Sequence, residues 1–257
     1  MADALDELNA RIAELRGNLA FVALAARLRP RIGDAIRWEA GVEVVQLARE
    51  FMNSATVRLE GVLGSLFVAL MASLERYVRM LVIQAVEKQA ELAKTYDEVP
   101  PTLANRNLVL TGRVLANIDA PREHITIDIE SMISNLASCK RGNSAFRLNV
   151  QAFSTTVTGV SPGVVEEALK AAGVPEWWDG VGGSAKLAGL LGTRGPRDTG
   201  NRARERLKEL CRWRNHLAHG GDEEVALSEA QLLEAIDFVV LFSDALNRSV
   251  QKHLQRR

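Results

Sequence analysis

The feature that most constrains this chain is a long stretch in which apolar residues recur with a helical period. From Asn53 to Tyr96 they mark one face of a single expected helix, which carries Leu59, Leu63, Leu66, Leu70, Leu74, Tyr77, Val78 and Leu81. Pro100 and Pro101 then stop the helix, because the residue before a proline avoids helical geometry. Elsewhere the alternating apolar pattern of strands is almost absent. The sequence therefore predicts an all-α fold, an antiparallel helical bundle.

The N-terminal segment has a second apolar pattern, with spacings that alternate between three and four residues. It places Leu5, Leu8, Ile12, Leu15, Leu19 and Val22 along one seam. The helix is expected to end near Pro30 and to pack against another helix. Because three heptads are few, a partner in its own domain is favoured over one in a second chain. Asp34 is suited to cap a further helix to about Phe51. We therefore divide the chain into a helical extension, residues 1–52, and a helical domain, residues 53–257.

The middle of the chain is predicted to hold shorter elements. Helices are expected at 103–117, at 128–139, at 146–157 and from Ser161–Pro162 to Gly173, with a short strand at "ITIDI", residues 125–129. The stretches "VPEWWDGVGGS" and "LLGTRGPRDTGN" are dense in glycine and proline, which predicts two loops around one short helix. Residues 192–200 of the second loop are expected to be mobile and to shape a cleft.

Two long helices are predicted to end the chain. The first spans about Thr199 to Ala218, and Gly220 and Gly221 stop it. The second begins with a capping box formed by Ser228 and Gln231. Its buried side is expected to carry Leu232, Leu233, Ile236, Val239, Val240 and Leu246.

Composition limits the class of protein. The formal net charge is zero, so a site for a polyanion must be local. The acidic N-terminus lacks the pattern of a signal peptide, and Ser73 and Glu75 break the longest apolar run before it could span a bilayer. We expect a cytoplasmic protein without membrane contact, with Cys139 and Cys211 reduced and with no cofactor.

The stretch "CRWRNHLAHGG", Cys211 to Gly221, gathers polar side chains at the end of the penultimate helix. Asn215 and His219 are four residues apart and share a face with His216 and Arg212, whereas Arg214 projects about 100° away from Asn215. The order Arg214, Asn215, three residues, His219 resembles the signature of the HEPN superfamily. That signature is an arginine, four to six residues and a histidine, with a polar residue directly after the arginine.

The context of the motif adds to this resemblance. The motif precedes a glycine turn and one last amphipathic helix, as in HEPN domains. The segments "LMASLERYVRMLV" and "FRLNVQAF" further look like the RiboL-PSP and MAE-type HEPN subfamilies. The resemblance covers roughly residues 54 to 254.

The resemblance implies a metal-independent endoribonuclease of the toxin or phage-defence class, which pairs two motifs across a homodimer interface. Histidine is suited to general acid or base catalysis near neutral pH, and arginine to neutralising charge on phosphate. Arg214 and His219 are the expected catalytic pair, with Asn215 and Arg212 in support. RNA is the expected substrate, and an antitoxin or defence-system protein a further partner. The alternative is a non-catalytic helical module that binds RNA or a protein.

A local excess of positive charge leads into the motif. Between Arg194 and Arg214 stand the basic residues Arg194, Arg197, Arg202, Arg204, Arg206, Lys208, Arg212 and Arg214, against only Asp198, Glu205 and Glu209. We take Arg194, Arg197, Arg202, Arg206, Lys208, Arg212 and His216 as candidate RNA contacts. A plain solvated helix face is the alternative.

Two other histidine patterns carry less weight. His216 and His219 with Cys211 could seed a metal site, but no second ligand pair has suitable spacing, so none is predicted. Arg248 and His253 repeat the spacing of the motif, and we interpret them as solvated surface near a frayed terminus.

Three further side chains are open to two interpretations. Trp177 and Trp178 favour an apolar plug at one end of the bundle over a surface that stacks on bases. Glu75 lies on an apolar face, where it either pairs with an arginine near the site or points to solvent.

Overall fold

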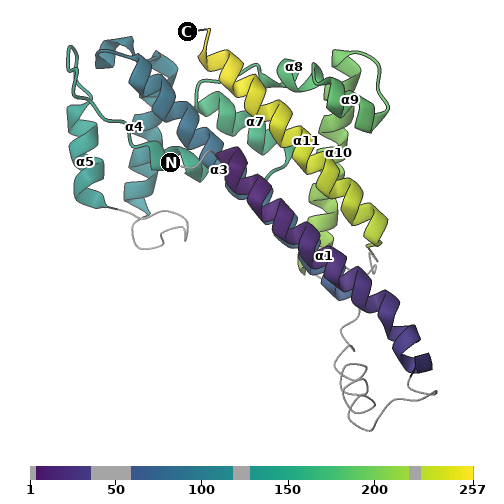
Figure 1. Ribbon diagram of the computed structural model, residues 1–257. Coiled ribbons are helices and arrows are strands. Elements are labelled where there is room, and N and C mark those ends of the chain that lie inside the picture. The colour runs from purple at the N-terminus through teal and green to yellow at the C-terminus, as the bar shows by residue number, and fades with distance from the viewer. Residues whose placement is uncertain (1–3, 36–58, 118–127, 220–226, 257) are drawn as a thin grey trace.

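The computed structural model describes residues 4–35, 59–117, 128–219 and 227–256, with side chains for all of these except residues 25–35, 59–60 and 219. Every regular element in this part is a helix, which confirms the predicted all-α class (Figure 1). The long helices are α1 (Ala4–Ala35), α3 (Leu59–Leu92), α10 (Pro196–His219) and α11 (Glu229–Leu254). The shorter ones are α4 (Pro101–Ala116), α5 (Ile129–Ser138), α6 (Val150–Phe153), α7 (Pro162–Ala171), α8 (Trp177–Gly182) and α9 (Ala185–Leu191), with 3-10 turns η1 (Tyr96–Glu98) and η2 (Ser154–Thr156).

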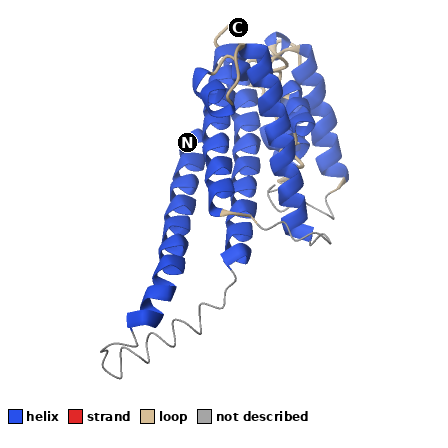
Figure 2. Ribbon diagram, turned by 90° about the vertical axis from the view of Figure 1, so that its right-hand side faces the viewer, coloured by secondary structure: helices blue, strands red, loops and turns tan. Residues whose placement is uncertain are grey.

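The core lies between the long helices, which run side by side in Figure 2. Helix α3 contacts α1, α10 and α11, so it is buried on several sides and not only on the one face that the apolar period predicted. Its residues Phe67, Leu70 and Leu74 expose no surface. The hydroxyl of Tyr77 donates a buried hydrogen bond of 2.9 Å to the carbonyl oxygen of Ser243 and so joins α3 to α11. No helix in the described part is both long and apolar enough to cross a membrane.

Helix α1 packs against α3 and α11 of the same chain, which confirms the favoured partner of the N-terminal helix. Its seam residues Leu8, Ile12 and Leu19 are at most 3% exposed. Arg76 of α3 reaches Glu7 at 2.7 Å, and Arg16 reaches Asp237 of α11 at 2.6 Å. Apolar contact and ion pairs therefore fix α1 on the bundle.

The predicted end of this helix is wrong. Helix α1 continues past Pro30 to Ala35, and Asp34 lies inside it rather than at the start of a new helix. A proline within a helix removes one backbone hydrogen bond and adds a clash, which weakens the helix without always ending it. The rest of the helix predicted from Asp34 to Phe51 lies outside the described residues.

Helices α4, α5 and α6 form a smaller group around a buried asparagine. Asn149 donates from Nδ2 to Thr111 Oγ1 at 3.1 Å and to the carbonyl oxygen of Met132 at 3.0 Å, and its backbone N–H donates to Asn107 Oδ1 at 2.8 Å. These bonds hold the backbone before residue 150 outside a helix. The helix predicted at 146–157 is therefore limited to α6 and η2.

The helices predicted at 103–117 and 128–139 are confirmed as α4 and α5. Asp128 caps α5 by accepting a hydrogen bond from the backbone N–H of Ser131 at 3.1 Å. The strand prediction is wrong for Ile129, which begins α5, and residues 125–127 lie outside the described part.

One predicted loop is a helix. Residues Trp177–Gly182 form α8, which packs against α10 and α11. Its glycines allow close contact: a Cβ at Gly180 would lie 2.2 Å from Ser249 Oγ, and one at Gly182 would lie 2.2 Å from the carbonyl oxygen of Pro196. Glycine here reflects tight packing, whereas the sequence pattern suggested a turn.

The last two helices agree closely with the prediction, with two exceptions. Helix α10 already begins at Pro196, so residues 196–200 of the predicted mobile loop are helical. The capping box of Ser228 and Gln231 is present at α11. Leu233, predicted on the buried side of α11, is 40% exposed.

Candidate functional site

Helix α10 carries the predicted motif at its C-terminal end, which packs closely on α3. Ala203, Leu207 and Leu210 of α10 expose no surface. Leu217 is half-buried, and a Cβ added at Gly64 of α3 would lie 3.2 Å from its Cδ2 atom. The absence of a side chain at Gly64 therefore lets the last turns of α10 lie directly against α3.

Arg214 and Asn215 contact each other at this end of α10. Arg214 Nη1 donates a hydrogen bond of 3.2 Å to Asn215 Oδ1. Arg214 is half-buried and Asn215 is exposed. Within the described part of the chain, no carboxylate lies at ion-pair distance from the Arg214 guanidinium.

His219 is the last residue of α10, four residues after Asn215. This spacing puts the two positions about 6 Å apart along the helix axis and on neighbouring parts of one face. The side chain of His219 lies outside the described part. His216 and Arg212, the other candidates of this face, are both exposed.

Cys211 lies one turn before Asn215 and packs against the core. Burial raises the pKa of its thiol to about 11; the nearby charge of Arg214 lowers this pKa, whereas that of Glu75 raises it. A thiol with this pKa carries almost no thiolate near neutral pH. Cys211 is therefore a packing residue in the folded protein.

Glu75 pairs with an arginine of its own helix. Its carboxylate binds Arg79, four residues on, and the Glu75 side chain is 18% exposed. Arg79 also donates from Nε to the carbonyl oxygen of Val157 at 3.3 Å. Of the two interpretations of Glu75, the structure supports pairing with arginine.

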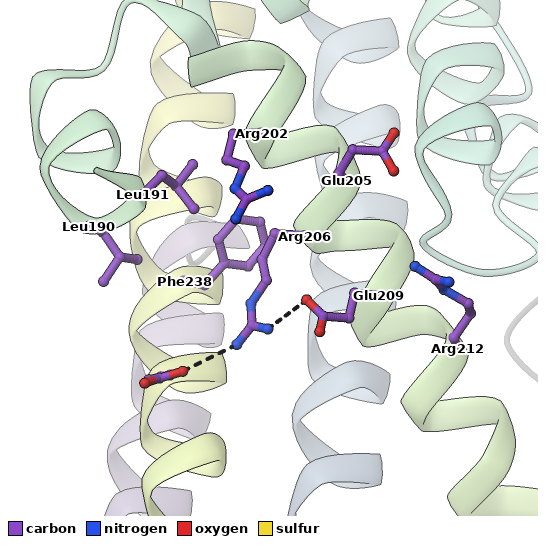
Figure 3. Close-up of a pocket in the computed structure, with 9 residues that line it drawn as sticks. Leu190, Leu191, Arg202, Glu205, Arg206, Glu209, Arg212 and Phe238 are labelled. Atoms are coloured by element: carbon purple, nitrogen blue, oxygen red, sulfur yellow. Dashed lines mark hydrogen bonds and ion pairs between the residues drawn. The ribbon is translucent and has the colours of Figure 1, made fainter. Parts of the chain in front are cut away.

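A groove of about 540 Å³ runs along α10 and reaches Arg212 (Figure 3). Its lining combines apolar and charged side chains, namely Leu190, Leu191, Arg202, Glu205, Arg206, Glu209, Arg212, Glu234 and Phe238. The three arginines are balanced by three glutamates. The groove as a whole therefore offers little net charge to a phosphate backbone.

Arg206 is the most constrained arginine of this groove. Its Nη1 atom donates to Glu209 at 2.7 Å, and its Nη2 atom lies 3.7 Å from Glu234 of α11 (Figure 3). The guanidinium also lies over the ring of Trp213, 5.1 Å from the ring centroid, and the side chain is only 18% exposed. The structure thus places Arg206 in intramolecular contacts, although the sequence suggested an RNA contact.

The other predicted RNA contacts divide into paired and unpaired cations. Lys208 lies 2.7 Å from Glu205 of its own helix, and their hydrogen bond is the main cause that lowers the pKa of Glu205. Arg194, Arg197, Arg202 and Arg212 are exposed, and none has an ion-pair partner in the part that the structure describes. The neutralising residues that the sequence did not reveal are Glu166 and Glu234, which come from α7 and α11.

Arg248 and His253, which repeat the spacing of the motif, both make contacts within the protein. Arg248 binds Asp244, and His253 Nε2 lies 3.0 Å from the carbonyl oxygen of Gly173. Leu254 is 4% exposed, so the end of α11 is packed and the predicted frayed terminus is wrong. Arg248 itself is exposed, as expected.

Trp177 of α8 is buried, as the predicted apolar plug requires, whereas Trp178 keeps an exposed part. Trp177 exposes no surface, stacks on Trp178 at 4.0 Å and meets Phe242 edge-on. Trp178 is half-buried. Among the described residues, no group of three or more His, Cys, Asp or Glu side chains is arranged to hold a metal ion.

The family model of RiboL-PSP-HEPN matches residues 49–252, close to the 54–254 expected from the sequence. The matched range contains α3, α10, most of α11 and the stretch from Arg214 to His219. Searches of curated proteins and of solved structures each found no match. The chain thus belongs to the RiboL-PSP-HEPN family.

Proposed function

We propose that this protein is a metal-independent endoribonuclease that cleaves RNA with Arg214, Asn215 and His219. The observation that carries the proposal is its membership of a HEPN family, whose domains are often RNase-like, together with the complete order of Arg, Asn and His in α10. Attack by the ribose 2'-hydroxyl needs a base, an acid and a group that neutralises phosphate charge. These residue types meet those needs.

The contacts of Arg214 support its assigned role. Its guanidinium has no carboxylate partner in the described part of the chain, and its bond to Asn215 orients it from one side. An arginine fork of this kind can bind two phosphate oxygens. We assign Arg214 to the phosphate, Asn215 to orienting Arg214 or the histidine, and His219 to proton transfer. Arg212 supports the phosphate from the exposed face.

A single histidine cannot act as base and acid in one turnover unless it carries the proton between the two sites. We therefore propose that two copies of the chain place their motifs opposite each other in a homodimer. A site shared in this way loses activity on dilution below the dimer dissociation constant. Measuring the cleavage rate per chain against protein concentration tests this part of the proposal.

We further propose that the enzyme acts as a toxin or phage-defence effector, held inactive by an antitoxin or another defence-system protein. Expression of the wild-type chain, but not of His219→Ala, should then arrest cell growth. Equal growth of both cultures would count against this role.

The main experiment incubates purified protein with tRNA, rRNA and mRNA, each with and without EDTA. Wild type is compared with Arg214→Ala and His219→Ala. The matched control is Arg248→Ala, because Arg248 has the same spacing to a histidine but lies on the surface of α11. Wild type and control should cleave RNA to 2',3'-cyclic phosphate ends, and the two motif variants should not.

Three outcomes would overturn the assignment. If all four proteins are inert, the chain is a non-catalytic module or needs a different substrate class. If all four cleave equally, the activity does not come from the motif. If EDTA abolishes cleavage by wild type, a metal-dependent reaction replaces the proposed one.

A further inference from the structure

A second cavity, of about 480 Å³, lies at the start of α10 and shares no lining residue with the groove of Figure 3. It is formed by Trp178 and Asp179 of α8 and by Arg197, Asn201 and Arg204 of α10, together with Pro196 and Gly200. The volume is within the range of sites for small organic ligands.

Part of this cavity is a flat stack of side chains. The Arg204 guanidinium lies over the Trp178 ring, 4.8 Å from the ring centroid, and Trp177 stacks on Trp178 at 4.0 Å. Glu166 of α7 lies 3.4 Å from Arg204 Nη2 and holds the guanidinium from outside the cavity lining. Trp177 and Arg204 flank the Trp178 ring, so the outer face of the Arg204 guanidinium is the planar surface on which a nucleobase can stack.

The rest of the lining offers polar groups of three kinds. Arg197 is exposed and has no ion-pair partner among the described residues, so it can bind a phosphate. Asn201 offers both a donor and an acceptor, and Asp179 accepts from exocyclic amines. An acidic peptide would use the arginines but neither the flat stack nor Asp179.

We propose that this cavity binds one nucleotide of a single-stranded RNA, with the base on the Trp178–Arg204 stack and a phosphate on Arg197. The inference rests on the proposed RNA substrate, and it adds a contact that is separate from the cleavage motif. Asn201 and Asp179 select among bases by their hydrogen bonds.

The position of the cavity on α10 gives the RNA a defined path. The exposed residues Arg197, Asn201, Lys208, Arg212 and Asn215 follow one another at helical spacing along one face. From Asn201 to His219 the helix rises by about 27 Å, at about 1.5 Å per residue. A strand held in the cavity can therefore follow α10 to the motif, and the cavity fixes how far from the bound nucleotide the strand is cut.

The test measures binding without cleavage. Fluorescein-labelled 2'-O-methyl oligonucleotides of about 4, 8 and 16 nucleotides, the span of known single-strand site sizes, cannot undergo attack by a 2'-hydroxyl. Anisotropy titrations compare His219→Ala with the same chain carrying Arg197→Glu or Asn201→Ala. The charge control is Arg141→Glu, whose side chain is 97% exposed in a turn before α6. Thermal melting confirms that each variant is folded.

Arg197→Glu should weaken binding of the longer oligonucleotides about tenfold and Asn201→Ala less, while Arg141→Glu leaves it unchanged. In a chain with His219 intact, Arg197→Glu should also cut a long RNA at variable distances from the bound nucleotide, whereas wild type cuts at a fixed distance. If Arg197→Glu binds like Arg141→Glu, or if no oligonucleotide binds, the inference fails.

Two further binding titrations, with mononucleotides and with polyglutamate, distinguish RNA from other ligands of this cavity. AMP, GMP, CMP or UMP that binds as tightly as the longest oligonucleotide would overturn the assignment to RNA in favour of a free nucleotide. Polyglutamate that binds with the same dependence on Arg197, while RNA does not, would overturn it in favour of an acidic protein.

The binding and cleavage results can be separated. RNA binding that depends on Arg197, in a protein that cleaves no RNA, supports the cavity and contradicts the proposed ribonuclease. RNA cleavage that depends on His219 but not on Arg197 supports the proposed ribonuclease and contradicts RNA binding in the cavity.

Discussion

Two arginines in the N-terminal part of helix α10 are held in ion pairs, whereas the arginine of the motif in the C-terminal part is not, within the described residues. In the N-terminal part, Pro196–Glu209, Arg204 and Arg206 each bind a glutamate from another helix and lie over a tryptophan ring. In the C-terminal part, Leu210–His219, Arg214 binds only the amide of Asn215 within the described residues. In the sequence both parts hold more basic than acidic residues. Counting basic residues in a sequence therefore overestimates the positive charge available for binding an anionic ligand, because some of these residues are already paired within the protein.

The largest expected effect is at the C-terminal part. Arg214→Ala should lower the RNA cleavage rate by about 10²-fold or more, as when a group that stabilises developing charge is removed. Its melting temperature should change little, because the Arg214 guanidinium forms no ion pair in the described structure. Single-turnover cleavage and thermal melting of the same sample test both parts. A large drop in melting temperature would instead make Arg214 structural.

The next effect is at the start of α10. Gly182→Ala should destabilise the protein by about 1–3 kcal/mol, because the new Cβ would meet the backbone of Pro196. For a chain of this size the melting temperature should fall by roughly 2–4 °C per kcal/mol. Gly189→Ala is the control, since a Cβ there meets nothing within 4 Å. Equal melting temperatures for the two variants would refute the close contact.

Arg206→Ala should have a smaller effect on stability and little on the cleavage step. It removes the bond to Glu209 and the contact with Trp213, and it leaves two carboxylates unpaired. We expect a loss of about 1 kcal/mol, because Glu209 and Glu234 remain partly in water. Urea unfolding measures the loss. Reduced cleavage with unchanged unfolding would place Arg206 on the RNA path instead.

The last effect concerns Cys211 and is confined to alkaline pH. Its thiol has a pKa of about 11 in the folded protein, whereas an unfolded thiol titrates near 8.5. The unfolded chain therefore loses this proton first, and stability that is present below pH ~8.5 is lost as the pH rises towards 11. The melting temperature of wild type should fall more steeply over this range than that of Cys211→Ala. Parallel curves would contradict the raised pKa.

Local patterns in the sequence predicted the long elements well. The apolar period gave the buried face of α3, and the Ser228–Gln231 capping box gave the start of α11. The period and the cap act within one helix, so they can be read without knowing its neighbours. The same holds for the order of Arg214, Asn215 and His219, although their roles stay a prediction.

Features that depend on distant partners were not predictable. Gly180 and Gly182 suggested a loop, but they serve close contacts with Ser249 and Pro196. The partners of Arg204 and Arg206 come from other helices, and no spacing in the sequence connects these residues. Tertiary packing therefore determines that residues 177–182 form helix α8, and it determines which arginines in the N-terminal part of α10 are held in ion pairs.

The packing of α1 has a consequence for how the chain can be divided. The family match begins at residue 49, yet Leu8, Ile12 and Leu19 of α1 complete the core on α3 and α11. A protein trimmed to the matched range would leave apolar surface of both helices in water, which favours aggregation. The range that the family model matches is thus shorter than the packed helical core, and expression of this domain should include α1.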